Sequence, residues 1–291
     1  MNINKITTSI LAACTMTLTS CNFSEDDCPR HGVLRAWADF DKISQTEIPA
    51  PSDCHLMAFG TRYDDIPSAT FSTDTLFWSL PRDTYQFIYY TGNYKTEETC
   101  CPFKMKLAVP TTTVDGKECI AYKQPYCSTA MFEREIYYQH TTDAEIIPTQ
   151  FVQRINLKVN VIGEDQIIEA IHSGLDGIFT SKCVSSRTAT GNATLLDKLA
   201  NIKGTKSWIC SNWVFGFNPK EKNLLTLDVQ MNEENAPLNE KQTVDLTPIL
   251  MNNDSPEISV EMDLNIGKEL SISNVTTIPD WVDVPEEDLT K

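Results

Sequence analysis

Histidine is scarce in this chain, and the residue spacing of a metal site is missing. The 291 residues include only four scattered histidines, His31, His55, His140 and His172. No C-x₂-C pair and no H-x₃₋₅-H pair occurs, although structural zinc sites usually have such spacing. The sequence therefore predicts no metal and no cofactor, and His31 near Cys28 is interpreted as a loop residue.

Catalytic motifs and positive charge are also in short supply. The chain has no G-x-S-x-G, H-E-x-x-H, G-x-G-x-x-G or P-loop motif, and paired carboxylates across a cleft cannot be read from sequence. Lysine and arginine number 24 against 40 acidic residues, which gives a net charge of −16. Such a chain repels nucleic acid, so the sequence predicts no nucleic-acid partner. Because the catalytic motifs are missing, it also predicts a protein that is not an enzyme.

Long hydrophobic runs are absent beyond the N-terminus, which predicts no transmembrane helix. The run from Ile6 to Leu18 follows Lys5 and is typical of a secretory signal. Two lipobox-like motifs could end it, "LAAC" at Cys14 and "LTSC" at Cys21. Cutting at Cys14 would leave an apolar segment of about half a dozen residues, shorter than usual. We therefore predict a lipoprotein signal peptide over 1–20 and acylation of Cys21.

The segment 21–27 carries an acidic cluster directly behind the predicted lipidated cysteine. Glu25, Asp26 and Asp27 are either a solvated spacer or an export signal. The second interpretation is favoured because the cluster resembles the signal that sends lipoproteins of Bacteroides-type bacteria to the outer face of the outer membrane.

Eight cysteines remain once Cys14 leaves with the signal and Cys21 takes lipid. An even number in an exported protein permits disulfides. Cys183 with Cys210 is the simplest pair in the C-terminal half, and Cys28 is expected to bond within the first domain. Eight cysteines allow 105 pairings, so the connectivity stays open.

Alternation with period two dominates after residue 30 and predicts strands with one buried face. The clearest cases are "FVQRINLKVNV" (151–161), "EISVEMDLNI" (257–266), "LLTLDVQM" (224–231) and "VLRAWADF" (33–40). Such strands favour antiparallel sheets packed as sandwiches. We expect an all-β fold of two tandem β-sandwich domains, 28–147 and 148–291, with one or two short helices, at 163–174 or 192–204.

The aromatic residues allow two interpretations. One is a stacking platform for sugars, and the favoured one is a sandwich core, which also consumes aromatics. The residues concerned are Trp37, Trp78, Tyr85, Tyr89, Tyr90, Trp208 and Trp213.

Several segments together resemble the fimbrillin-like lipoproteins of Bacteroidales, a family of fimbrial stalk, tip and anchor subunits. Besides the lipobox they are "DDCPRHGVLRAWADFD" (26–41), "LPRDTYQFIYYTGN" (80–93), "SGLDGIFTSKCVSSRTATG" (173–191) and "FGFNPKEKNLLTLDVQMNE" (215–233). In the second segment Asp83 stands where the family usually has glycine. The resemblance implies transthyretin-like sandwiches that assemble by strand exchange.

Stalk subunits of this family are cut after a basic residue that here would be Arg30, Arg35 or Lys42. The C-terminal segment 276–291 is either a donor strand or a tail, and two prolines interrupt it. These features favour an uncut accessory, tip or anchor subunit over a polymerising one. Asp74 to Leu76 also resembles the short O-glycosylation motif of these bacteria, which makes Thr75 a candidate modification site.

The resulting expectation is a lipid-anchored outer-membrane surface protein that acts in adhesion. Its expected partners are the membrane, other fimbrillin-like subunits, and glycans or proteins of host or bacterial surfaces. The alternative is a surface glycan-binding lipoprotein that serves nutrient uptake.

Overall fold

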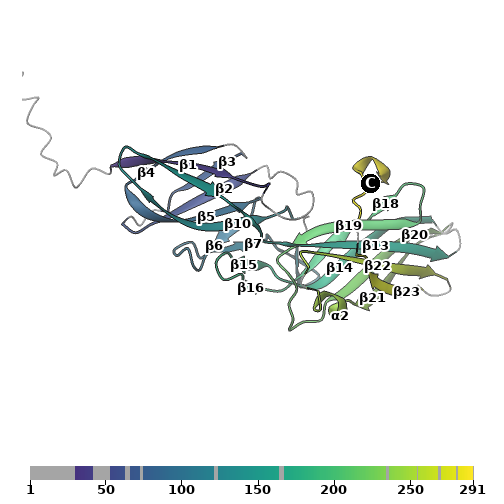
Figure 1. The fold of residues 1–291 in the computed structure, drawn as a ribbon. Coiled ribbons are helices and arrows are strands. Elements are labelled where there is room, and N and C mark those ends of the chain that lie inside the picture. Colours follow the sequence, from purple (N-terminus) through teal and green to yellow (C-terminus); the bar gives the residue numbers. More distant parts are fainter. Residues whose placement is uncertain are drawn as a thin grey trace, which may run out of the picture.

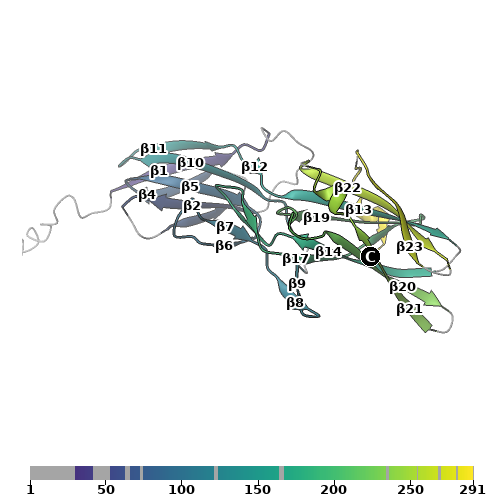
Figure 2. The ribbon, with the colours of Figure 1, turned by 90° about the horizontal axis from the view of Figure 1, so that it is seen from below.

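The computed structural model describes residues 30–41, 53–62, 66–72, 75–120, 124–163, 167–233, 236–253, 255–267, 270–279 and 281–290. They form two β-lobes placed end to end in an elongated molecule (Figures 1 and 2). Within these ranges the helical elements are the four-residue α2 (Thr247–Leu250) and the 3₁₀ turn η1 (Glu286–Asp288). The all-β prediction is confirmed, and none of the described helices could cross a membrane.

The first lobe is a sandwich of a three-stranded and a five-stranded sheet. The first sheet has the order β11 (Thr141–Ile146), β1 (His31–Ala38), β4 (Leu76–Pro81). The second has the order β12 (Thr149–Gln150), β10 (Ser128–Ile136), β5 (Asp83–Thr91), β2 (Cys54–Gly60), β3 (Ser68–Phe71). Strand β1 lies between its neighbours, parallel to β11 and antiparallel to β4.

Strand β5 is buried on both faces from Phe87 to Thr91, which explains the near-continuous aromatic and β-branched sequence there. Tyr85, Phe87 and Tyr89 point into the core between the two sheets of the first lobe. Ile88 and Tyr90 point to the other side and join the core that continues into the second lobe. A strand covered on both faces has no polar face and reads as a near-continuous apolar run.

The second lobe is a sandwich of two six-stranded sheets. One has the order β23 (Ser271–Thr277), β22 (Glu257–Ile266), β13 (Gln153–Gly163), β19 (Ser207–Val214), β18 (Ala200–Ile202), β24 (Leu289–Thr290). The other has the order β21 (Ala236–Asp245), β20 (Leu224–Glu233), β14 (Ile167–Ile178), β17 (Ala193–Lys198), β9 (Lys117–Ile120), β8 (Thr112–Val114). The predicted alternation of β22 is confirmed, because Ile258, Val260, Met262, Leu264 and Ile266 are all buried.

The two helix predictions are wrong. The segment 163–174 contributes to β13 and β14, and the segment 192–204 contains β17 and β18. A bulge between Ile168 and Ala170 shifts the register of β14 against β20. The extra residue changes the phase of the alternation, so the apolar residues Ile167, Ile168 and Ile171 have the spacing of a helix face.

The chain crosses between the lobes in both directions. The hairpin β8–β9 comes from the first half, yet β9 pairs in parallel with β17 of the second lobe (Figure 2). Conversely, β15 (Ser181–Cys183) and β16 (Ala189–Thr190) join β7 (Lys106–Ala108) and β6 (Lys95–Glu97) in a four-stranded sheet. The two halves of the sequence are therefore interleaved across the junction.

Two cations of the β15–β16 segment hold the junction. The Phe151 ring lies 4.9 Å from Lys182 Nζ and 5.0 Å from the Arg187 guanidinium carbon. Lys182 Nζ donates a hydrogen bond of 2.8 Å to the Phe151 carbonyl, and Arg187 donates one of 3.0 Å to the Gln150 carbonyl. These contacts fix the backbone at the point where the chain passes from β12 to β13.

The burial of Lys182 at the junction predicts that the free energy of unfolding rises at alkaline pH. Burial, and next the neighbouring Arg187, lower the pKa of Lys182 to about 8. An unfolded lysine keeps its proton to about pH 10.4, so the unfolded state binds more protons between these values and the free energy of unfolding rises with pH there. From about pH 8 to about pH 10 we expect wild type to gain about 2 kcal/mol over Lys182→Met in urea titrations.

The matched control is Lys220→Met, at an exposed turn lysine. It should follow wild type across the whole interval. Parallel stability curves for wild type and Lys182→Met would show that this ammonium is not destabilised by folding.

Candidate functional site

The predicted lipidation and export residues, Cys21, Glu25, Asp26 and Asp27, lie outside the described residues, as does Cys28. Thr75 is described, exposed, and directly precedes β4. A hydroxyl in this position is accessible to an enzyme, and its glycosylation stays a prediction.

The predicted bond between Cys183 and Cys210 is not formed in the structure, where Cys183 is a free thiol. Cys183 lies on β15, with Sγ 3.5 Å from the Phe103 carbonyl, whereas Cys210 lies on β19 in a different sheet. Counting cysteines by chain half fails here because β15 leaves the second lobe to pair with β7. All other described cysteines, at 54, 100, 101, 119 and 127, are free as well.

The aromatic residues serve mainly as core, as favoured above. Tyr85, Tyr89, Tyr90 and Trp208 are buried. Trp213 is partly buried and packs edge-on against Tyr126 at 5.2 Å. These residues do not gather into an exposed platform, so a sugar-binding site has to be sought elsewhere.

Strand β1 occupies a position that matters for strand exchange. Its Leu34 and Ala36 side chains are fully buried in the first lobe. Of the candidate cleavage residues, Arg30 precedes β1 and Lys42 lies outside the described residues. Arg35 lies within the strand and donates two hydrogen bonds, of 2.7 and 2.5 Å, to the Asp143 carboxylate.

The C-terminal segment folds back on its own lobe. Its last strand, β24, pairs with β18 at the edge of a sheet. Upstream, Asp283 accepts hydrogen bonds from Arg154 of β13 and from the Trp281 indole. In this structure the segment is a tail bound in cis.

A groove crosses the outer face of the sheet that contains β14, and Gly174 lies in one of the two pockets that form it. Across the strands, Gly174 is opposite Leu196 of β17 and Thr226 of β20. Along β14, its neighbours on the same face are His172 and Asp176. Two adjoining pockets of about 470 and 310 Å³ make up the groove and share Lys117, Asp176 and Thr194.

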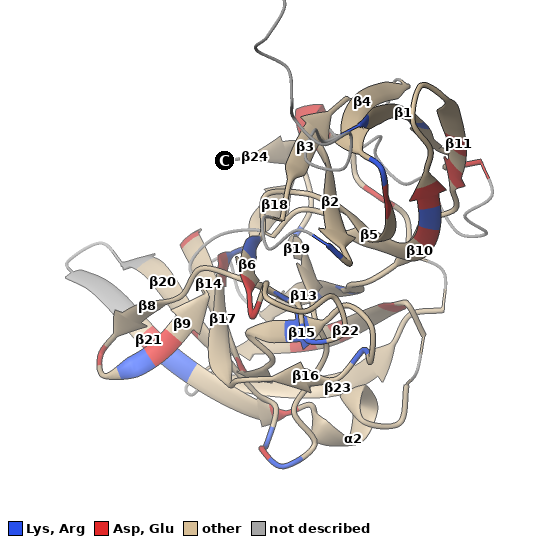
Figure 3. Ribbon diagram, turned by 90° about the vertical axis from the view of Figure 1, so that its left-hand side faces the viewer, with Lys and Arg blue, Asp and Glu red and all other residues tan. Residues whose placement is uncertain are grey.

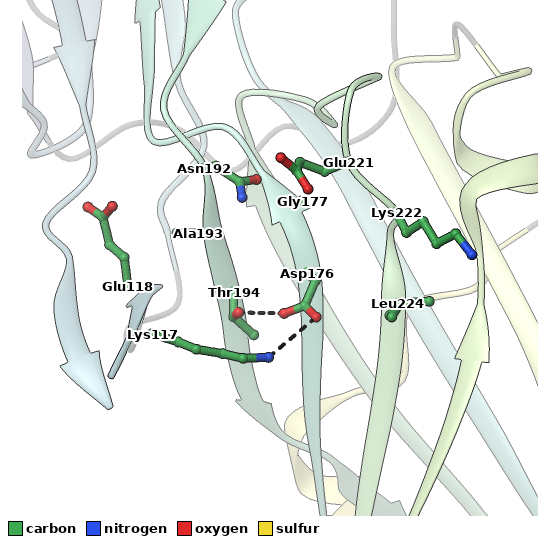
Figure 4. Close-up of a pocket in the computed structure, with 10 residues that line it drawn as sticks. All are labelled: Lys117, Glu118, Asp176, Gly177, Asn192, Ala193, Thr194, Glu221, Lys222 and Leu224. Atoms are coloured by element: carbon green, nitrogen blue, oxygen red, sulfur yellow. Dashed lines mark hydrogen bonds and ion pairs between the residues drawn. The ribbon is translucent and has the colours of Figure 1, made fainter. Parts of the chain in front are cut away.

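The centre of the groove is built by side chains that come from both halves of the sequence (Figure 4). Thr194 Oγ1 donates a hydrogen bond of 2.5 Å to Asp176 Oδ1, and Lys117 Nζ of β9 lies 3.7 Å from Asp176 Oδ2. Between Leu175 and Ile178 the register of β14 against β17 shifts. Asn223, which is fully buried, donates to the Asp176 and Gly177 carbonyls and fixes the backbone at this irregularity. Asp176 is thereby held facing the groove.

The second pocket extends toward the edge strand β21. Asp228 lies opposite both His172 and Lys241 in the sheet, and Lys241 Nζ is 3.2 Å from Asp228 Oδ2. The other carboxylate oxygen, Oδ1, is buried and has no hydrogen-bond donor in the described structure. Figure 3 shows acidic and basic residues next to one another along β9 and β21. The second pocket itself is lined by residues of both signs, among them Lys117, Asp228 and Lys241.

Sequence patterns did not reveal this groove. Its residues come from β8, β9, β14, β17, β20 and β21, and the parallel pairing of β9 with β17 has no local signature. One sequence feature does point to the groove. His172, Gly174 and Asp176 are alternate residues, so in a strand they share one face, and a glycine lies between the two polar residues. The helix predicted over 163–174 conceals this pattern.

No model of a known protein family matches the chain, and no curated protein matches it either. Solved structures do match. A candidate adhesin from Bacteroides ovatus aligns at 12% identity over 93% of this chain and 96% of its own, with a TM-score of 0.54. A candidate polysaccharide-binding protein from Bacteroides thetaiotaomicron aligns at 9% identity over 88% and 99%, with a TM-score of 0.52.

A candidate cell adhesion protein from Bacteroides eggerthii aligns at 10% identity over 87% of this chain and 97% of its own, with a TM-score of 0.51. The chain therefore has the fold of these Bacteroides proteins across most of its length. The β-sandwich fold implied by the resemblance to the fimbrillin-like lipoproteins of Bacteroidales is confirmed.

Proposed function

We propose that this protein is a lipid-anchored component of the bacterial outer surface that acts in adhesion, as an accessory, tip or anchor subunit of a fimbria-like assembly. It is not an enzyme. The fold shared with Bacteroides adhesin-type structures over 93% of the chain carries this proposal. The lipobox at Cys21, upstream of the first described strand, supports the membrane attachment.

The position of β1 supports a subunit that is not cut. A stalk-type subunit must release its first strand to open a sheet for a partner's strand. Here β1 is the middle strand of its sheet and its apolar face is fully buried, so leaving would expose two strand edges and a core. A subunit that keeps this strand does not accept a neighbour there and suits one end of an assembly.

Strand exchange would then run in the other direction, with this chain as donor. The tail 281–290 is the candidate because it is held in cis by one short strand pair, by polar contacts around Asp283, and by hydrogen bonds from Lys203 to the Glu287 and Asp288 carbonyls. Releasing it breaks surface contacts at a sheet edge, whereas releasing β1 disrupts a lobe. Its partner would be another fimbrillin-like subunit with an open sheet.

The anchor is tested by Cys21→Ala in the native host. Several acyl chains bind a membrane stably, whereas their removal leaves a protein with no described membrane-spanning helix. We expect most of the variant in the soluble fraction and most of the wild type in the outer membrane, measured by immunoblotting of separated fractions. Cys14→Ala is the matched control and should stay in the membrane; continued membrane partitioning of Cys21→Ala would contradict the anchor.

The assembly role is tested by affinity capture of the wild-type protein from outer-membrane fractions after mild cross-linking. We expect other fimbrillin-like subunits among the captured proteins. A variant that ends at residue 280 should lose them if the tail is the donor strand. Capture of no such subunit by wild type would contradict assembly.

A further inference from the structure

Gly174 occupies a strand interior where nothing in the structure demands a glycine. A Cβ atom at this position would lie 3.5 Å from its nearest neighbours, Leu196 Cδ2 and Thr194 Cγ2, which is ordinary contact. The contrast is Gly177 in the same strand, with φ +80°, where a Cβ would lie 2.3 Å from Asn223 Nδ2. Gly177 is therefore required by the fold, and Gly174 is not.

A glycine in a strand interior lowers stability because it loses more backbone entropy and contributes no packing. Such a residue commonly marks a place where a ligand approaches the backbone closely. Here the missing side chain leaves a depression in the middle of a sheet face, framed by His172, Asp176, Leu196 and Thr226. The depression belongs to the pocket of about 310 Å³.

The lining of the depression selects against anionic ligands. Both of its lysines are already close to carboxylates, Lys117 to Asp176 at 3.7 Å and Lys241 to Asp228 at 3.2 Å. A third carboxylate, Asp115, lines the same pocket, so acidic residues outnumber basic ones there and an anion is repelled. What remains available is hydrogen bonding, from carboxylate oxygens, the Thr226 hydroxyl and the His172 ring.

The lining also offers an apolar surface beside these polar groups. Leu196 flanks Gly174 on one side, and Val114 of the β8–β9 hairpin, 40% exposed, lines the same pocket. A ligand that suits this combination has one face of C–H groups and a rim of hydroxyls. A sugar ring has both, and each of its hydroxyls can donate and accept.

We propose that the groove that contains Gly174 binds a neutral saccharide, with one sugar ring over the Gly174 backbone and its hydroxyls hydrogen-bonded to the polar groups around it, the Asp228 carboxylate among them. The Asp228 side chain is 31% exposed at the wall of this pocket, and Lys241 Nζ, 3.2 Å from Oδ2, holds it there. The adjoining pocket of about 470 Å³ gives room for a neighbouring sugar unit, so the ligand is an oligosaccharide rather than a monosaccharide. Only its role in adhesion rests on the proposed function; the binding itself does not.

The test uses the full-length protein purified in detergent. A printed array of defined neutral, sialylated and sulfated oligosaccharides is probed first, and the best neutral binder is then titrated by calorimetry. We expect neutral glycans to dominate, Gly174→Ala to weaken binding, and Gly174→Val to abolish it, because the side chain grows into the depression. Asp228→Ala should lower affinity about tenfold or more, as expected for the loss of a hydrogen bond to a charged group.

Two matched controls keep the test specific. Thr276→Val places a valine at an exposed position of β23 in the opposite sheet, and Asp263→Ala removes a carboxylate that accepts a hydrogen bond from Asn274 on that sheet. Both should bind like wild type. The melting temperature of Gly174→Val should not fall, which separates a blocked site from a damaged fold.

The proposal is overturned if no neutral glycan on the array is bound, if binding is confined to charged glycans, or if Gly174→Val binds as tightly as wild type. These outcomes are independent of the membrane test. A Cys21→Ala protein that stays in the membrane contradicts the lipid anchor but not saccharide binding in the groove. An array on which no neutral glycan is bound contradicts saccharide binding but not the lipid anchor.

Discussion

A mature chain that begins at Asp39 is expected to lose the folded first lobe and to recover it when a peptide covering residues 30–38 is added. Strand β1 is the middle strand of its sheet, so its absence leaves β11 and β4 without their shared partner. It also removes the buried Leu34 and Ala36 from the core. Loss of one buried leucine costs about 2–5 kcal/mol, and a domain has only about 5–15 kcal/mol of net stability.

The measurement is size-exclusion chromatography together with near-ultraviolet circular dichroism of the truncated chain. Without peptide we expect association through the open edges and loss of the aromatic signal of β5; with peptide we expect a monomer with the native signal. A peptide carrying Leu34→Asp and Ala36→Asp is the control and should not restore folding. A truncated chain that is monomeric and native without peptide would refute the structural role assigned to β1.

Replacing Asp83 by alanine is expected to destabilise the protein by about 2–4 kcal/mol. The Asp83 carboxylate is 2% exposed and accepts four hydrogen bonds. They come from the Thr61 hydroxyl at 2.5 Å and from the backbone N–H groups of Thr61, Arg62 and Thr84 at 2.7, 2.9 and 2.8 Å. Alanine would leave these donors without an acceptor where the chain leaves β2 and where β5 begins.

The effect of Asp83 should depend on pH. Burial alone would raise the pKa of this carboxyl, but the hydrogen bonds from Thr61, Arg62 and Thr84 outweigh burial and lower it. A lowered pKa means that the stabilisation is complete above the unfolded value of about 3.9 and is lost as the pH falls through the folded value. The stability difference between wild type and Asp83→Ala, measured by urea unfolding, should therefore be full at neutral pH and shrink below about pH 4.

The matched control for Asp83 is Asp263→Ala, a carboxylate on an outer strand face with a single hydrogen-bond donor, Asn274. We expect a change within about 0.5 kcal/mol for it, as for surface substitutions in general. A difference between wild type and Asp83→Ala that stays constant from neutral to acidic pH would show that the carboxylate charge is not what stabilises this corner.

Strands with one buried face could be predicted from sequence, and strands with an interrupted pattern could not. In β22 every second residue from Ile258 to Ile266 is buried, so period two is visible directly. In β14 the bulge at Ile168 breaks the phase, and the apolar residues take a spacing that suits a helix. In β5 both faces are covered, so its aromatic residues could be placed in a strand but not assigned to a face.

The partners of each strand depend on long-range packing, and this is where local patterns give no information. Nothing in "KECI" (117–120) shows that β9 pairs with β17, about 75 residues later. The same holds for Cys183, whose neighbours are set by the pairing of β15 with β7. The groove depends on the pairing of β9 with β17. For that reason the sequence indicated the residues of a predicted lipid anchor but not the residues of the groove.

The parallel pairing of β1 with β11 determines how the first lobe would resist mechanical load. The lipid would hold the chain ahead of His31, where β1 begins, and the rest of the molecule continues from Ile146, where β11 ends. Because the two strands run in the same direction, a load between membrane and ligand acts at opposite ends of the pair. The six-residue ladder from Val33–Thr141 to Ala38–Ile146 is then loaded in shear, and its hydrogen bonds must fail together rather than open one after another. A surface protein tethered in this way would resist the drag of flow through β1, the strand that stalk subunits of the fimbrillin-like family release.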